Sequence, residues 1–280
     1  MKNHLFKYFL AIQCAFATLW HELFWNLRLS LFSLLKRKHV LFRVLNELHK
    51  NGYAHYENYL TQNEVMILRE ELRKTTASYK DHKDDIGKLE RVPGGIKLKH
   101  LYGEFSFSKF LRNDITLHLI AASYIGQFRF MFPDLIYTCT HDNSIFVEGV
   151  PGKSDNAMND KPHRDNWTHF LKLIIALDDI SEENGPTALL KGTHNISSLS
   201  WREQFYTYRI MRKSPEAKVL FDSKEGALTN EQIDSLLPSH PEVKVCLKAG
   251  DAFFIDTKSL HYAKNLVSGS REALFLNFPC

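Results

Sequence analysis

Apolar positions follow two different periods in the two halves of this chain. Up to about residue 127, large apolar residues recur every three or four positions, which is the spacing of one face of a helix. Helices are therefore predicted in the first 43 residues, in a segment that ends near Asn51-Gly52, in a segment that begins at Thr61, and over residues 108–127. A short strand is expected between the second and third of these helices.

Local signals define the third helix and the segment that follows it. Thr61 is followed three residues later by Glu64, the capping-box pattern in which the two side chains accept each other's backbone N–H groups. The helix is therefore predicted to begin at Thr61. Residues 80–100 are charged and contain glycine and proline, so we expect a loop there.

From Phe128 onward the pattern is one of short apolar runs separated by turn-forming residues, which is typical of strands. A helical first half followed by roughly seven or eight strands indicates an α+β, mainly β fold, in which helices buttress one sheet of a β-sandwich or jelly roll. Residues 197–240 interrupt the strands with a charged helical insertion, which in a jelly roll lies over the barrel mouth. The runs are 135–141, 144–149, 169–179, 187–192, 243–250, 251–257 and 271–278.

The last run has two unlike faces, because alternate residues of a strand point to opposite sides. One face is apolar and suits packing against helices, whereas the other carries a guanidinium group and an amide toward whatever the sheet encloses. A buried guanidinium needs an anion, supplied by the protein or by a ligand. The two faces are Glu272, Leu274, Leu276 and Phe278, and Arg271, Ala273, Phe275 and Asn277.

Residues 1–45 are predicted to form a basic, amphipathic helical arm, and residues 46–280 the remaining domain. Among the first 43 residues Glu22 is the only carboxylate, against seven lysines and arginines. The apolar run is interrupted at His21-Glu22 and falls short of the about 20 residues that a transmembrane helix needs.

Three interpretations of the arm were weighed. Ala15-Phe16-Ala17 resembles a signal-peptide cleavage site, but the amphipathic pattern continues beyond it. A second interpretation places Trp20, Trp25 and the basic residues 36–39 against an anionic membrane surface. In the third, the helices cap the main domain. The second and third are favoured over secretion.

Charge and cysteine content bear on two questions, whether the protein binds nucleic acid and in which compartment it works. The formal charge of +4 and the isoelectric point near 8.7 are too mild to indicate nucleic acid, and no nucleic-acid-binding motif is present. The four cysteines lie far apart without a CxxC pair, which favours reduced thiols in the cytosol. A cytoplasmic protein, peripheral on the inner face of the membrane, is therefore expected.

The candidate chemistry lies in four residues. His163 and Asp165 are two apart before an apolar run, so in an extended chain they share a face. His261 follows another run, and Arg271 begins the last run ten residues later. Two imidazoles and one carboxylate on one face of an ion form the set used by non-haem Fe(II) oxygenases.

These segments resemble a known family. The stretch "HRDNWTHFLKLIIALDDISEENGPTALLKGTH", followed by "GDAFFIDTKSLHYAKNLVSGSREALFLNF", is similar to the phytanoyl-CoA dioxygenase-type Fe(II)/2-oxoglutarate-dependent oxygenases. The resemblance covers residues 130–280, about half of the chain. It implies a double-stranded β-helix (jelly roll) core and a hydroxylase that uses Fe(II), 2-oxoglutarate and O2.

The resemblance also implies roles for residues. His163, Asp165 and His261 bind Fe(II), and Arg271 pairs with the distal carboxylate of 2-oxoglutarate. Because related halogenases lack the carboxylate, Asp165 indicates hydroxylation. Which residue holds the keto-acid end is open, and the candidates are Asn159, Thr257 and Trp167.

The substrate is inferred from the basic arm and from the sequence around "FLKLIIALDDISEENGP". The chain resembles the Kdo hydroxylases, which act on the inner-core sugar of lipopolysaccharide, so a lipid-linked or acidic sugar at a membrane surface is the first expectation. A fatty acyl-CoA or a small metabolite is the alternative. A non-catalytic, membrane-associated jelly-roll binding protein is the alternative of another class, against which the complete set of four residues argues.

Overall fold

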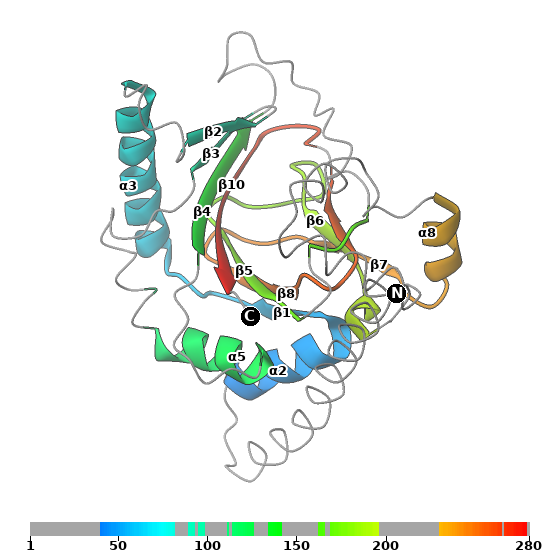
Figure 1. Ribbon diagram of the computed structural model, residues 1–280. Helices are drawn as coiled ribbons and strands as arrows, with labels where there is room; N and C mark the ends of the chain where they lie inside the picture. Colours follow the sequence, from blue (N-terminus) through cyan, green and yellow to red (C-terminus); the bar gives the residue numbers. More distant parts are fainter. Residues whose placement is uncertain are drawn as a thin grey trace, which may run out of the picture.

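The computed structural model describes residues 40–81, 89–92, 95–98, 111, 114–125, 134–141, 162–165, 169–195, 230–264 and 266–278. In this part of the chain two antiparallel sheets pack against each other (Figure 1). The large sheet has the strand order β1-β8-β5-β10-β4-β3-β2 and the small sheet the order β7-β6-β9. The strands are β1 (Tyr53–Tyr56), β2 (Leu89–Val92), β3 (Gly95–Leu98), β4 (Asp134–His141), β5 (Leu171–Ala176), β6 (Thr187–Leu190), β7 (Glu242–Val245), β8 (Ala252–Asp256), β9 (His261–Ala263) and β10 (Ser270–Phe278).

Three helices cover the outer face of the large sheet, away from the small sheet. They are α2 (Val40–Asn51), α3 (Gln62–Asp81) and α5 (Ile115–Ile125), and Figure 1 shows α2 and α5 side by side with α3 apart from them. Leucines of the helices, such as Leu48 and Leu68, pack with strand residues such as Phe254 and Leu276 in one buried cluster. Full burial of each such side chain stabilises the fold by about 1.5–3 kcal/mol. This layer buries the outer face of the large sheet.

A second apolar cluster fills the space between the sheets. Ile174, Phe253 and Ala273 of the large sheet pack there with Leu189 and Val245 of the small sheet. Side chains that point between the sheets therefore share one enclosed space. Polar residues on the same faces are the ones that can take part in a site.

The two faces of β10 confirm the predicted division. Leu274, Leu276 and Phe278 belong to the cluster with the helices, whereas Ala273 and Phe275 pack in the cluster between the sheets. The strand lies between β5 and β4, so both of its edges are paired.

Gly52 lets the chain turn sharply from α2 into β1. Its φ is +82°, and a Cβ there would lie 2.3 Å from Ser259 Oγ and 2.7 Å from His194 Nδ1. Its N–H donates to Leu48 O at 2.8 Å and its carbonyl accepts from Asp256 N at 2.9 Å. Only glycine fits both this backbone angle and this space.

The predicted capping box is present at the start of α3. Glu64 Oε2 accepts hydrogen bonds from Thr61 N at 2.8 Å and from Thr61 Oγ1 at 2.7 Å. Glu64 N in turn donates to Thr61 Oγ1 at 3.3 Å. The helix begins one residue later than predicted, at Gln62.

Two elements differ from the expectation. The segment 80–100, predicted to be a loop, contains the end of α3 and the hairpin of β2 and β3, because β3 finds a partner in the distant strand β4. The segment His261–Ala263 was not predicted to be a strand, yet it pairs with β6 as β9. In both cases a long-range pairing partner overrides local composition.

Several expectations fall outside the described residues. These are the structure of residues 1–39 of the arm, the strand at 144–149, and residues 197–229 of the insertion. Helix α2 crosses the expected boundary between residues 45 and 46, with Val44, Leu45 and Leu48 buried. In the stretches that the structure describes, no helix is both long and apolar enough to cross a membrane.

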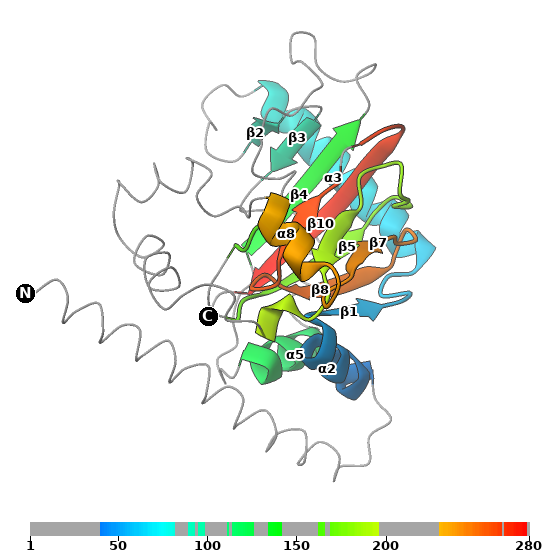
Figure 2. The same cartoon turned by 90° about the vertical axis from the view of Figure 1, so that its right-hand side faces the viewer.

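The described end of the insertion packs against the small sheet. Helix α8 (Asn230–Leu236) directs Ile233 and Leu236 against Leu190 and Leu260, and Leu260 directly precedes His261. Figure 2 shows α8 in front of the strands, on the side of the small sheet. Because Leu189 packs between the sheets and Leu190 points the other way, α8 covers the outer face of the small sheet.

Candidate metal centre

Backbone hydrogen bonds bring His163 and His261 directly opposite each other. His163 N donates to His261 O at 3.0 Å, and His261 N donates to His163 O at 2.9 Å, forming an isolated antiparallel bridge. Asp165 N donates to Thr257 O at 3.1 Å, in the turn between β8 and β9. The H-x-D segment is therefore held against the chain that connects β8 and β9.

The three candidate ligands converge. Asp165 Oδ1 lies 3.5 Å from His163 Nε2, and Asp165 Oδ2 lies 3.5 Å from His261 Nε2. One ligand atom from each residue lies within 4.8 Å of the other two. Donors that are each about 2.1 Å from one ion lie about 3 Å apart at right angles, so small shifts suffice to close the set around a metal. Among the described residues no other group of three such side chains converges in this way.

The protonation states suit metal binding. His261 Nδ1 donates to Ser259 O at 2.9 Å, because a carbonyl can only accept, and this leaves the lone pair of Nε2 directed at the site. Burial would raise the pKa of Asp165, but the nearby ammonium group of Lys172 holds that pKa well below its usual range. The set thus presents one anion and at least one correctly oriented imidazole.

A lysine belongs to the immediate surroundings of the set. Lys172 Nζ lies 2.6 Å from Asp165 Oδ2, at the start of β5. The sequence interpretation did not single out this residue. The sequence does contain an indication of its position, because alternation along "LKLIIA" puts the lysine on the same strand face as Ile174 and Ala176, which packs between the sheets.

A buried polar cluster lies behind the H-x-D segment, centred on Asp256. The Asp256 carboxylate is fully buried and accepts hydrogen bonds from Tyr124 Oη at 2.7 Å, from Lys258 N at 3.0 Å and from His169 Nδ1. Burial raises the pKa of Asp256, but the attraction of His169 and its hydrogen bond keep the pKa far below its usual range. His169 thus secures β8 to the chain that enters β5, and it is not part of the converging set.

Arg164 and His194 complete this cluster. Arg164 Nη2 donates to Thr193 O at 2.9 Å, and alternation along the extended segment turns its side chain away from those of His163 and Asp165. Its burial lowers its pKa to about 10, against the attraction of Asp256. His194 Nε2 donates to the His49 carbonyl at 2.8 Å, and burial lowers the pKa of His194 to about 4. His194 is therefore neutral near pH 7.

Of the three candidates for holding the keto-acid end of 2-oxoglutarate, the structure describes one. Thr257 is buried next to Asp165, and its Oγ1 has no hydrogen-bond partner among the described atoms. Asn159 and Trp167 lie outside the described residues. The structure therefore locates only Thr257 beside the converging set.

Arg271 is the second residue of β10. Its Nη1 donates to Gly185 O, and burial lowers its pKa. Leu189 lies opposite His261 in the small sheet, and Gly185 is four residues earlier. Arg271 contacts Gly185 and His261 pairs with Leu189, so both residues are attached to the same short stretch of chain, residues 185–189.

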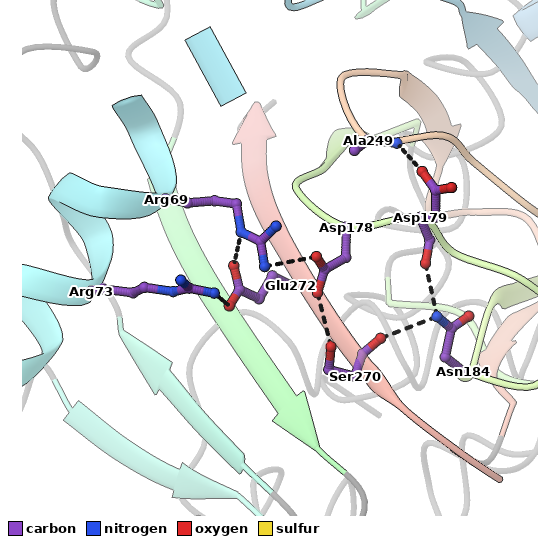
Figure 3. Close-up of polar contacts among 8 residues, drawn as sticks. All are labelled: Arg69, Arg73, Asp178, Asp179, Asn184, Ala249, Ser270 and Glu272. Carbon is purple, nitrogen blue, oxygen red and sulfur yellow. Dashed lines mark hydrogen bonds and ion pairs between the residues drawn. The ribbon is translucent and has the colours of Figure 1, made fainter. Parts of the chain in front are cut away.

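An ion-pair network on the outer face of the large sheet holds the strand around Arg271 (Figure 3). Glu272 is buried and bonded by Arg69 Nε at 2.7 Å and by Arg73 Nη2 at 2.9 Å, both from α3. Arg69 Nη2 also pairs with Asp178 at 2.7 Å, and Asp178 accepts from Ser270 Oγ at 3.0 Å. Burial raises the pKa of Glu272, but the two arginine hydrogen bonds keep it below its usual value.

The turn after β5 is fastened to the same strand. Asn184 Nδ2 donates to Ser270 O at 3.1 Å and to Asp179 O at 2.8 Å (Figure 3). Gly185, with φ +74°, follows, and a Cβ there would lie 2.9 Å from Lys264 O. The "ENGP" segment therefore places the carbonyl that Arg271 contacts.

Two imidazoles and one carboxylate that converge are the ligand types used by non-haem iron oxygenases. The family described as phytanoyl-CoA dioxygenase (PhyH) matches residues 48–273, beginning well before the segment 130–280 in which the resemblance was noted. The chain belongs to this family, and its class, an Fe(II)- and 2-oxoglutarate-dependent dioxygenase, is confirmed.

Solved structures share the fold at low sequence identity. The epimerase SnoN, in complex with Fe3+, alpha ketoglutarate and nogalamycin RO, is 17% identical with a TM-score of 0.56, over 85% of this chain and 82% of that chain. EctD from S. alaskensis, with 2-oxoglutarate and 5-hydroxyectoine, is 14% identical with a TM-score of 0.57, over 84% of this chain and 74% of that chain. No curated protein matches the chain in sequence.

Proposed function

We propose that the chain is a hydroxylase in which His163, Asp165 and His261 bind Fe(II) and Arg271 binds the distal carboxylate of 2-oxoglutarate. The convergence of the three ligand atoms within 4.8 Å carries this proposal. The core is then a double-stranded β-helix, formed by the two sheets that pack against each other. Bound Fe(II) supplies the redox chemistry that couples decarboxylation of 2-oxoglutarate by O2 to hydroxylation of a substrate C–H.

The residues of the chain prepare this chemistry in four ways. The hydrogen bond to Ser259 O orients the His261 ring, and the lowered pKa keeps Asp165 anionic. The planar fork of Arg271 suits a two-pronged pairing with a carboxylate. Thr257 Oγ1, buried and without a described hydrogen-bond partner, is our candidate for the keto-acid end, together with Asn159 and Trp167.

Metal binding and co-substrate turnover test this assignment. Protein reconstituted with Fe(II) without oxygen should retain iron and, in air, convert 2-oxoglutarate to succinate. His163→Ala and His261→Ala should abolish both properties. His240→Ala is the matched control, because the His240 ring contacts the Lys191 carbonyl instead. Wild-type protein that neither retains iron nor binds 2-oxoglutarate would refute the enzyme assignment and favour a non-catalytic binding protein.

For the substrate we propose a lipid-linked or acidic envelope sugar, with Kdo of the lipopolysaccharide inner core as the most specific candidate. The excess of basic residues in the arm and the ammonium group of Lys172 beside the ligands support an acidic substrate. A small metabolite is the second candidate, since the solved relatives carry small molecules. Mass spectrometry after incubation with Kdo-lipid, acyl-CoA and small-acid panels decides, because only the true substrate gains one oxygen atom.

We further propose that residues 1–45 hold the enzyme at the cytoplasmic face of a membrane. The proposal rests on the basic, amphipathic sequence of this arm. Flotation with phosphatidylethanolamine vesicles containing phosphatidylglycerol tests it. Replacing Lys36, Arg37 and Lys38 by glutamate should release the chain from the vesicles, and unchanged flotation would contradict the proposal.

A further inference from the structure

Lys172 occupies an unusual position for a lysine, on the enclosed face of a central strand. Its neighbours Leu171 and Leu173 pack with the helices, whereas Ile174 packs between the sheets. Alternation places Lys172 on the face of Ile174. Its side chain is only 20% exposed and ends 2.6 Å from Asp165 Oδ2.

The two carboxylate oxygens of Asp165 therefore have different surroundings. Oδ1 lies 3.5 Å from His163 Nε2. Oδ2 lies 3.5 Å from His261 Nε2 and also accepts the short hydrogen bond from Lys172. A charge-assisted hydrogen bond of this length occupies a lone pair of Oδ2 and fixes the plane of the carboxylate.

We propose that Lys172 is a positioning residue that makes Asp165 bind the metal through a single oxygen. The inference rests on the proposed function, since it concerns the same metal. A six-coordinate ion held by two imidazoles and one carboxylate oxygen has three open positions, whereas a chelating carboxylate leaves two. The reaction needs two positions for the keto acid and one for O2. By engaging Oδ2, Lys172 keeps the third position open.

The charge of Lys172 gives the proposal a distinctive signature. A fixed ammonium group beside the site repels a divalent cation and attracts the dianionic co-substrate. Replacing Lys172 by a neutral residue should therefore strengthen metal binding, by about tenfold if the charges are about 5 Å apart in a water-like dielectric. The same change should weaken 2-oxoglutarate binding. A general disturbance of the fold would instead weaken both.

Cobalt(II) is a suitable probe, because it is stable in air and its visible d–d bands report its coordination. The variants are Lys172→Met, which keeps the length of the side chain, and Lys172→Arg, which keeps its charge. Lys244→Met is the matched control, because Lys244 lies on β7 and the change removes the same charge from its exposed ion pair with Glu182. Calorimetry on the full chain measures Co(II) and 2-oxoglutarate affinities.

In Lys172→Met we expect tighter Co(II) binding, weaker 2-oxoglutarate binding and a changed d–d spectrum. Lys172→Arg and Lys244→Met should keep the wild-type spectrum. The proposal would be overturned if Lys172→Met left both affinities and the spectrum unchanged, or weakened both affinities together. It would also be overturned if Lys172→Arg showed the same changes as Lys172→Met. Wild-type protein that fails to bind Co(II) refutes the proposed function instead, so the two failures are distinguishable.

Discussion

The contact between Arg69 and Glu272 is the part of the fold whose energy is most directly testable. Glu272 lies on the strand that carries Arg271, and its side chain is 2% exposed. Arg69 contacts Glu272 and Asp178 at 2.7 Å each and is 28% exposed. Replacing Arg69 by methionine keeps the aliphatic stem but leaves a buried carboxylate with less compensation.

The magnitude lies between two limits. Exposed ion pairs contribute about 0–1 kcal/mol, and removal of one partner of a fully buried pair costs about 3–5 kcal/mol. Arg73 still bonds Glu272 at 2.9 Å after the change, and Arg69 is partly exposed, so we expect a coupling of about 2 kcal/mol.

A double-mutant cycle of Arg69→Met, Glu272→Gln and the double variant measures this coupling. Urea unfolding of the full chain, followed by tryptophan fluorescence at pH 7, supplies the free energies. Because the folded pKa of Glu272 is lowered, its contribution is present above the unfolded pKa near 4.5 and is lost as the pH falls through the folded value. The coupling should therefore shrink in acid. A coupling below about 0.5 kcal/mol at pH 7 would show that the pair behaves like a surface contact.

Three further changes follow from the described contacts. Gly52→Ala should destabilise the fold by about 2 kcal/mol or more, because the new Cβ meets Ser259 Oγ at 2.3 Å and φ is +82°; an unchanged melting temperature would contradict this. Asp256→Asn should cost about 3 kcal/mol in urea unfolding, since it removes the buried charge that Tyr124 and its neighbours bond, and a loss under about 1 kcal/mol would argue against the cluster. His194 has a lowered folded pKa of about 4, so the unfolded chain takes up its proton first as the pH falls from 6.5 toward 4. Over that window wild-type stability should fall by about 1.4 kcal/mol per pH unit more than that of His194→Gln, and parallel curves would exclude the effect.

Much of the site was predictable because its signals are local or carried by strand alternation. The spacing of His163 and Asp165 places both side chains on one face of an extended segment, and the alternation in "REALFLNF" separates Arg271 from the residues that face the helices. The capping box of Thr61 and Glu64 likewise depends only on neighbouring residues.

Other features depend on partners that are far apart in the chain. The hairpin of β2 and β3 forms in a charged segment because β4 offers an edge to pair with, and composition alone predicts a loop. The buried charge of Asp256 is tolerated because Tyr124 and His169 converge on it from other elements.

The sequence by itself determined the class of this protein, since residue types and short spacings encode helices, strand faces and the ligand set. Only the tertiary structure decided that Lys172 lies against Asp165 and that Arg69 of α3 pairs with Glu272. The physical reason is that a charge acts over a few ångströms in space, and separation along the chain does not report that distance until the strands have paired.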